Sequence, residues 1–200
     1  MSPPTRLAAA AAVVVAACGV PSGTQLGTGM DTLPPPGFGT LRQDEVTVAL
    51  SSGPLEVKVT PLAESVIRVT APDTYRRLSG LASLHLPEAV RQTGFANPTL
   101  FLVSFFSEAP ETAFVPEELQ IISRGMRLRA ESILPVTPGW GQRRLAQRAT
   151  EMAVYAFADR ADLESDLVVA YGLVESGAWN AILPRVQAER ARARARGAFE

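Results

Sequence analysis

Apolar residues recur at every second position along much of this chain from Asp44 onward. Such alternation places the apolar side chains on one face of a β-strand, so it predicts half-buried strands rather than helices. The alternating segments are 46–50, 55–60, 67–70, 126–132, 152–157 and 167–171. Because regularly spaced helical patterns do not separate them, we expect an antiparallel sheet protein and not an alternating α/β fold.

Residues 99–107, TLFLVSFFS, differ from these segments because they are apolar on both faces. This pattern predicts a central strand that other elements cover on both sides. A further strand is expected at 119–124. With about eight short strands in residues 44–175, the sequence predicts a mainly β fold, an antiparallel β-sandwich.

A helical crossover between the two sheets is expected at residues 73–93. Asp73 is a suitable N-cap, and Pro87 would start a second turn that runs through Val90. The apolar face of this helix would carry Tyr75, Leu78 and Leu81 or Ala82.

Residues 176–200 predict a C-terminal helix with an Arg-rich end. Its apolar positions follow i, i+3, i+4 and i+7 spacing and are Trp179, Ile182, Leu183 and Val186. Ser176 is the expected N-cap, and Pro184 should kink or split the helix. Beyond Val186 the sequence AERARARARG has no apolar residue larger than Ala, so we expect this end to project into solvent and fray.

Residues 19–43 are rich in Gly and Pro and show no periodic pattern. Such a segment buries too little apolar surface to offset the entropy lost on ordering. We therefore expect residues 18–43 to form a flexible tether, which Pro34, Pro35 and Pro36 stiffen locally.

The N-terminus has the organisation of a secretory signal peptide. Arg6 precedes an apolar run from Leu7 to Ala17, which is too short to span a bilayer as a helix. The run ends in Val15-Ala16-Ala17-Cys18, which resembles the lipobox of bacterial lipoproteins. The resemblance implies removal of residues 1–17, a diacylglycerol on the Cys18 thiol, and usually acylation of the new amino terminus with a fatty acid such as palmitate.

A plain secretory signal, with Cys18 near the cut by chance, is the alternative. Cys18 is the single cysteine of the chain and cannot form an internal disulfide. Under the lipoprotein interpretation the mature protein lies outside the cytoplasm and is held to a lipid bilayer by acyl chains. In this family an Asp after the cysteine tends to retain the protein at the inner membrane. Gly19 stands there instead, which favours the outer membrane if the source has one.

The number and spacing of strands over residues 44 to about 172 resemble the immunoglobulin-like sandwiches that are common in exported bacterial lipoproteins. The cysteine pair of true immunoglobulin domains is absent, because no cysteine follows Cys18. The resemblance implies an immunoglobulin-like β-sandwich with an adhesive or scaffolding role. It carries over no catalytic residue.

Charge and motif content limit the possible functions. Loss of residues 1–17 would leave 18 basic and 20 acidic residues, a net charge of −2, whereas a nucleic-acid-binding protein should carry a basic surplus. His85 is the single histidine, which excludes a multi-histidine metal site. Nucleophile-elbow, phosphate-loop and zinc-protease motifs are absent. We therefore predict no nucleic-acid partner, no metal and no cofactor, and interpret His85 as a structural or surface residue.

An acidic cluster lies between two expected strands and comprises Asp159, Asp162, Glu164 and Asp166. It is either an exposed acidic turn or a calcium site, since carboxylate oxygens are good calcium ligands. Its spacing matches no calcium loop and Arg160 interrupts it, which favours the turn. In an alternative function, these acids or Glu108 and Glu111 would form the carboxylate pair of a hydrolase.

Two segments are candidate binding surfaces. Trp140, with Arg143 and Arg144 beside it, either contacts an anionic partner or plugs the open end of the sandwich. The second segment contains Arg190, Arg192, Arg194 and Arg196. These side chains either remain solvated or contact acidic phospholipid or lipopolysaccharide headgroups.

Together these features predict a membrane-anchored extracytoplasmic lipoprotein, a non-enzymatic module that binds or scaffolds another protein of the cell envelope. The alternative is a membrane-anchored hydrolase that uses carboxylates. A pocket with two inward-pointing carboxylates would favour the hydrolase, whereas a filled interior would favour the binding module.

Overall fold

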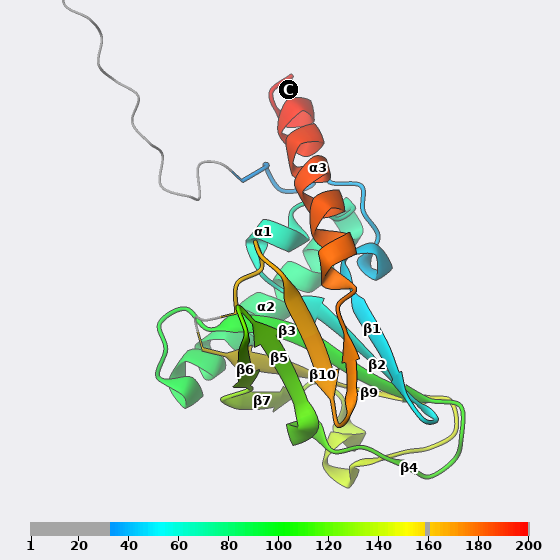
Figure 1. Ribbon diagram of the computed structural model, residues 1–200. Helices are drawn as coiled ribbons and strands as arrows, with labels where there is room; N and C mark the ends of the chain where they lie inside the picture. Colours follow the sequence, from blue (N-terminus) through cyan, green and yellow to red (C-terminus); the bar gives the residue numbers. More distant parts are fainter. Residues whose placement is uncertain (1–32, 159–160, 200) are drawn as a thin grey trace, which may run out of the picture.

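The computed structural model describes residues 33–158 and 161–199 (Figure 1). Two antiparallel sheets pack face to face and form the predicted β-sandwich. The five-stranded sheet contains, in spatial order, β1 (Val48–Ser52), β2 (Leu55–Pro61), β3 (Thr99–Ser107), β9 (Ala149–Phe157) and β7 (Ser132–Pro135). The four-stranded sheet contains β11 (Val174–Ser176), β10 (Leu167–Tyr171), β5 (Leu119–Ser123) and β6 (Met126–Arg129). A separate pair contains β4 (Thr112–Ala113) and β8 (Arg144–Leu145).

Helical segments connect and flank the sheets. The α-helices are α1 (Glu64–Ile67), α2 (Pro72–Thr93) and α3 (Trp179–Gly197). The 3-10 helices are η1 (Gln43–Val46), η2 (Pro116–Glu118) and η3 (Pro138–Gln142). The sequence did not predict β4, β8 or β11, because strands of two or three residues are too short to show alternation.

β3 is the central strand of the five-stranded sheet, as its sequence predicts. Phe101, Val103 and Phe105 point into the core between the two sheets. Leu100 and Leu102 point to the opposite face, where they pack with residues of α2. Each fully buried side chain of this size contributes about 1.5–3 kcal/mol of transfer free energy. Because β3 is buried on both faces, its sequence has no polar face.

α2 confirms the expected helix at 73–93, but its connection differs. It joins β2 to β3, which are neighbours in the same sheet, and therefore does not cross between sheets. Ala71, and not Asp73, occupies the N-cap position. Pro87 lies inside one continuous helix.

The strand expected at 67–70 is wrong. Ile67 ends the short helix α1 (Glu64–Ile67), residues 68–69 form a turn, and Thr70 makes only an isolated bridge with Leu41. Val66 and Val69 are buried in the core between the sheets, whereas Ile67 packs under α2. Two apolar residues with one polar residue between them also fit a helical turn that is buried on two sides. So short a segment cannot distinguish the two periods.

The strand expected at 126–132 is divided between the two sheets. β6 ends at Arg129 in the four-stranded sheet, and β7 begins at Ser132 in the five-stranded sheet. The Glu131 N–H donates a hydrogen bond to the Ala156 carbonyl at 2.9 Å where the chain crosses. Alternation continues through the crossing because Leu128 and Ala130 pack against the same core.

α3 carries the predicted apolar face, since Trp179, Ile182, Leu183 and Val186 are all buried. Ser176 is not the N-cap, because it ends β11 and Ala178 takes that position. Pro184 does not split the helix. The expectation that the chain frays after Val186 is also wrong. The helix continues to Gly197, with Glu189 and Ala193 buried in its second half.

Candidate functional site

The second half of α3 extends beyond the sheets, and the first described residues of the chain run beside it (Figure 1). We call residues 33–42 the N-terminal strap. The sequence assigned this segment to a flexible tether at 18–43, but the strap packs onto the folded body, and Leu41 is part of the core. Residues 18–32 of the expected tether, including Cys18, lie outside the described residues.

The strap meets the body through backbone contacts near α1. The Leu41 N–H donates to the Val69 carbonyl at 3.0 Å, and the Ala71 N–H donates to the Leu41 carbonyl at 2.8 Å. Gly39 makes the approach possible, since a Cβ there would lie 2.1 Å from the Val69 carbonyl carbon. At the far end of α3, a Cβ on Gly197 would lie 2.3 Å from Cγ of Pro35. Gly39 therefore lets two backbone segments lie in contact, and Gly197 makes room for the Pro35 ring.

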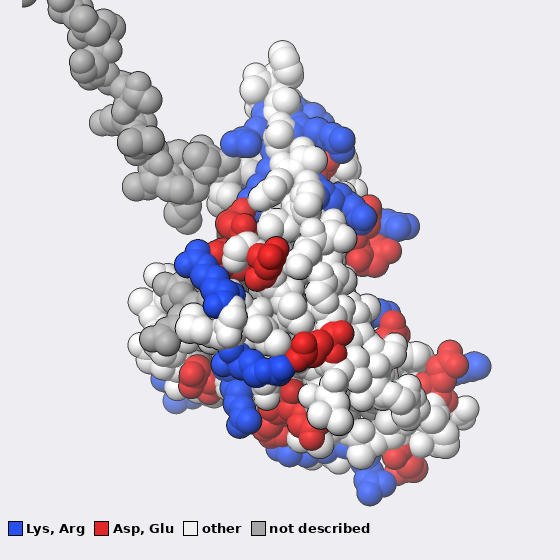
Figure 2. Space-filling model, viewed as in Figure 1, with Lys and Arg blue, Asp and Glu red and all other residues white. Residues whose placement is uncertain are grey.

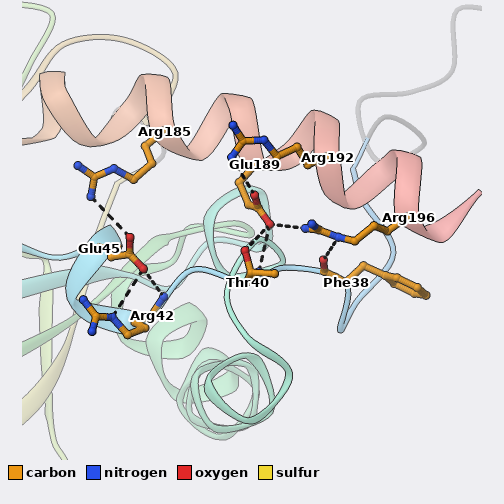
Figure 3. Close-up of polar contacts among 8 residues, drawn as sticks. All are labelled: Phe38, Thr40, Arg42, Glu45, Arg185, Glu189, Arg192 and Arg196. Atoms are coloured by element: carbon orange, nitrogen blue, oxygen red, sulfur yellow. Dashed lines mark hydrogen bonds and ion pairs between the residues drawn. The ribbon is translucent and has the colours of Figure 1, made fainter.

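A polar cluster around Glu189 joins the strap to α3 (Figure 3). The Glu189 side chain is only 2% exposed. Its Oε1 accepts hydrogen bonds from the Thr40 hydroxyl at 2.8 Å, from the Thr40 N–H at 3.2 Å, and from Nη2 of Arg196. Nη1 of Arg192 lies 3.6 Å from the other carboxylate oxygen. Arg196 also donates from Nε to the Phe38 carbonyl at 2.9 Å.

These contacts keep the Glu189 carboxylate ionised. Burial alone would raise its pKa, because the charged form loses hydration. The hydrogen bonds from Thr40 and Arg196, together with the charge of Arg196, outweigh that effect and lower the pKa below its ordinary value. The cluster is therefore a buried, compensated charge, and its contribution to holding the strap is greatest while the carboxylate is ionised.

The arginines near the C-terminus fall into two kinds. Arg190 is 13% exposed, places two nitrogens on Glu164 at 2.7 Å, and donates from Nε to the Ser65 carbonyl. Arg190 thus holds α3 to the body, and Arg196 holds it to the strap. Arg192 and Arg194 are exposed on the same helix. Figure 2 shows blue side chains on both sides of this part of α3.

Trp140 lies at the open end of the sandwich and is 7% exposed. Its ring centroid lies 5.2 Å from that of Phe114, 5.7 Å from that of Phe105 and 6.1 Å from that of Tyr155. Such aromatic clusters bury large areas and add pairwise attraction. Of the two alternatives drawn from the sequence, the structure therefore supports the plug over the contact aromatic.

The arginines beside Trp140 form exposed ion pairs. Arg143 follows η3 in a left-handed conformation and places two nitrogens on the Glu117 carboxylate, at 2.6 and 3.2 Å. Arg144 lies 3.6 Å from Glu111. Exposed pairs of this kind contribute little to stability, about 0–1 kcal/mol. With Trp140 buried, the segment does not present the combined aromatic and cationic surface that the sequence suggested.

A groove of about 810 Å³ lies beside the sandwich, between α1, the second half of α2, β6 and residues 161–164. Its lining is mainly apolar and includes Leu62, Leu86, Leu100, Met126 and Leu163. Glu64, Asp162 and Glu164 also line it. Among the apolar residues, Leu86 and Met126 are exposed to solvent. These two side chains form the accessible apolar part of the groove.

Each carboxylate of the groove has an arginine partner. Glu64 pairs with Arg68, Asp162 with Arg124 and Glu164 with Arg190. The Glu164 N–H donates to Asp162 at 2.9 Å; this bond, reinforced by Arg124, lowers the pKa of Asp162 although burial opposes it. A general acid at neutral pH needs a raised pKa, so Asp162 is poorly suited to that role. The groove is better suited to binding.

The other candidate residues of the sequence are dispersed. Glu108 and Glu111 lie in the β3–β4 loop and do not line the groove, and Asp166 also lies outside it. Within residues 33–158 and 161–199, no group of three or more His, Cys, Asp or Glu could hold a metal ion. Asp159 lies outside these residues. His85 is half-buried in α2, and burial lowers its pKa.

Sequence reasoning missed the Thr40–Glu189 contact and the groove. One signal was present, since Glu189 is the lone acid within the basic sequence PRVQAERARARARG and stands near the apolar stripe of α3. The partner in the strap could not be found in this way, because the two residues are far apart in the chain. The groove combines residues from five separate segments and has no local pattern.

No known protein family, curated protein or solved structure matches the chain. Among the helices of the described residues, none has the length and apolar character needed to cross a membrane.

Proposed function

We propose that this protein is a lipid-anchored, extracytoplasmic module of the cell envelope that binds another envelope protein without catalysing a reaction. Val15-Ala16-Ala17-Cys18 supports the anchor, because a single cysteine stands where a lipobox requires it. The acyl chains on Cys18 would hold the protein to the bilayer, and the sandwich would present its binding surface from there.

The observation that carries this proposal is the path of the strap. Its first residues lie at the C-terminal end of α3, with Pro35 against Gly197. Residues 19–32 separate Leu33 from Cys18, and a chain of this length spans at most about 50 Å, at roughly 3.3–3.6 Å per residue. An anchor at Cys18 would therefore keep this end of α3 near the bilayer. The groove, beside β6 and the second half of α2, remains open to a partner.

The groove supports binding better than the exposed strand edge does. β6 is an edge strand of its sheet, but it has only four residues and carries Arg127 and Arg129. Short, charged edges are a common protection against pairing with other strands. Leu86 and Met126 in the groove, by contrast, are exposed apolar side chains in a concave setting. The carboxylate-based hydrolase stays the alternative, although the arginine pairing of Glu64, Asp162 and Glu164 does not favour it.

The anchor is tested in bacteria by the substitution Cys18→Ser. We expect this variant to move from the membrane fraction to the soluble fraction and to lose incorporation of labelled palmitate. Ser22→Ala, just beyond the expected cleavage site, is the control and should keep both properties. Mass spectrometry of the wild-type protein should find an acylated Cys18 at the amino terminus. An uncleaved, unmodified terminus would contradict the anchor.

The binding surface is tested by placing a photo-crosslinking residue at Met126 in the groove. Arg148 is a matched exposed position away from the groove. We expect Met126 to give a discrete crosslinked product in native membranes, and Arg148 to give none of that size. Equal products at both positions, or none at Met126, would argue against the groove as the binding surface.

A further inference from the structure

We propose that the C-terminal end of α3 is a docking surface for anionic phospholipid headgroups, with Arg192, Arg194 and Phe199 as its contact residues. We call residues 190–199 the basic end of α3. The proposal rests on the proposed lipid anchor only for the location of the protein at a bilayer. The contact itself needs no acyl chain, and it can be tested without one.

Charge is the first argument. The basic end contains four arginines and no acidic residue. Glu164 and Glu189 offset the charges of Arg190 and Arg196, and Glu200 follows the basic end. A helix C-terminus carries about half a negative charge, which these arginines exceed. The basic end therefore remains cationic and attracts a negatively charged surface.

The distribution of the arginines indicates how the helix would approach the surface. Arg192 and Arg194 are two residues apart, so they project on roughly opposite sides of the helix but differ in height by only about 3 Å. Arg192 is 70% exposed, and Arg194 is exposed as well. A helix that lay flat would present one of them and turn the other away. A helix that approaches end-on presents both.

The tip of the helix fits the same orientation. Phe199 follows the helix and is 91% exposed, beyond both arginines along the chain. In Figure 2 the tip of α3 is uncharged, and blue side chains flank it further down. An aromatic side chain beyond a pair of cations is the arrangement expected at a membrane interface. The aromatic side chain enters the headgroup layer, and the cations remain beside the phosphates.

The other two arginines hold the tip in place and are not proposed as contacts. Arg190 is bound to Glu164 and the Ser65 carbonyl, and Arg196 is bound to Glu189 and the Phe38 carbonyl. The N-terminal end of the strap therefore lies beside the proposed contact residues. A tether that attaches at the docking surface raises the effective concentration of that surface at the bilayer, so weak headgroup contacts can fix the orientation of the whole domain.

The test measures co-sedimentation with lipid vesicles. The protein is the whole chain from residue 18 onward with Cys18→Ser, so that acyl chains contribute nothing. We expect it to bind vesicles of phosphatidylcholine that contain phosphatidylglycerol, and to bind pure phosphatidylcholine vesicles much more weakly. Added salt should release it, because salt screens contacts between exposed charges.

The double variant Arg192→Gln/Arg194→Gln should lower the partition coefficient about 25-fold, because each arginine near an anionic surface contributes about fivefold. The matched control is Arg129→Gln/Arg148→Gln, which removes the same charge from exposed positions on the sandwich and should bind as the parent does. Phe199→Ala should also weaken binding. Unchanged thermal melting of each variant shows that the fold persists.

Three results would overturn the proposal. The first is that the parent protein does not sediment with anionic vesicles. The second is that the two double variants lose vesicle binding equally. The third is that soluble inorganic phosphate releases the protein at constant ionic strength, which would indicate an ion site instead of a lipid surface. None of them depends on lipidation. Failure here leaves the Cys18 anchor intact, and failure of the Cys18→Ser fractionation leaves this contact intact.

Discussion

Thr40 and Glu189, 149 positions apart in the sequence, are joined by two hydrogen bonds to one carboxylate oxygen, from the Thr40 hydroxyl and from its backbone N–H. The contact connects the first described segment of the chain to its last helix (Figure 3). Arg196 binds both Glu189 and the Phe38 carbonyl, so the same cluster contacts the strap at Phe38 and at Thr40. The strap and the second half of α3 therefore depend on each other.

Loss of the Glu189 charge should destabilise the fold. Glu189→Gln keeps the shape of the side chain but leaves Arg196 without its anionic partner, so we expect a cost of about 1–3 kcal/mol in the free energy of unfolding. Chemical denaturation measures this cost. Glu88→Gln is the control, because it removes an exposed carboxylate that also binds an arginine on its own helix, and it should leave stability nearly unchanged. Equal effects of the two variants would contradict the structural role of Glu189.

Stability should fall in acid partly because of Glu189. The pKa of Glu189 is lowered in the folded state, whereas the pKa of an unfolded Glu is about 4.3. The stabilisation is therefore complete above the unfolded pKa and is lost as the pH falls through the lower folded pKa. Denaturation at a series of pH values should show a shallower acid decline for Glu189→Gln than for the parent. Asp162, whose pKa is also lowered, accounts for a separate part of the decline, so Asp162→Asn should leave the Glu189 part in place.

Gly39→Ala should be strongly destabilising. The added Cβ would lie 2.1 Å from the carbonyl carbon of Val69, and backbone atoms cannot move aside cheaply. Gly80→Ala is the matched control, since Gly80 lies in α2 with nothing within 4 Å of an added Cβ. It should raise stability by up to about 1 kcal/mol, through the higher helix propensity of Ala. Melting temperatures of both variants test the pair, and a tolerated Gly39→Ala would show that the strap does not need this close contact.

Truncation of the aromatic plug should cost far more than truncation of an exposed apolar side chain. Trp140→Ala removes an indole that packs against Phe105, Phe114 and Tyr155, and should lower the free energy of unfolding by about 3–5 kcal/mol. Leu173→Ala, at a fully exposed turn, should have almost no effect. Similar small losses in both variants would restore the interpretation of Trp140 as a contact residue.

The parts of the fold that repeat a period were predictable from the sequence. Alternation located β1, β2 and β10, two-sided apolarity located β3, and the i, i+3, i+4, i+7 stripe located α3. These patterns are local, and burial on one or both faces of a regular element produces them. The expected strand at 67–70 failed where the pattern was shortest, because two buried residues fit a helical turn equally well.

The candidate site was less predictable, because distant residues build it. Gly and Pro in residues 33–42 indicated a tether, yet Gly39 is there to allow close packing against Val69. A Gly- and Pro-rich composition is compatible both with disorder and with tight backbone contact. Which of the two occurs depends on whether another segment, such as the one around Val69, packs against it. Arg190 and Arg196 appeared equivalent to Arg192 and Arg194 in the sequence. The structure distinguishes them by bonds to other segments, since Arg190 binds Glu164 and the Ser65 carbonyl, and Arg196 binds the Phe38 carbonyl.

The pairing of Thr40 with Glu189 also bears on the order in which the protein is completed. The strap emerges from the ribosome before either sheet, and its partner helix emerges after both. Contacts with so large a sequence separation form slowly, since the intervening chain must first become compact. The Thr40–Glu189 contact therefore forms after the sheets, and a nascent chain that stops short of Glu189 would hold the strap through Leu41 and its bonds to Val69 and Ala71.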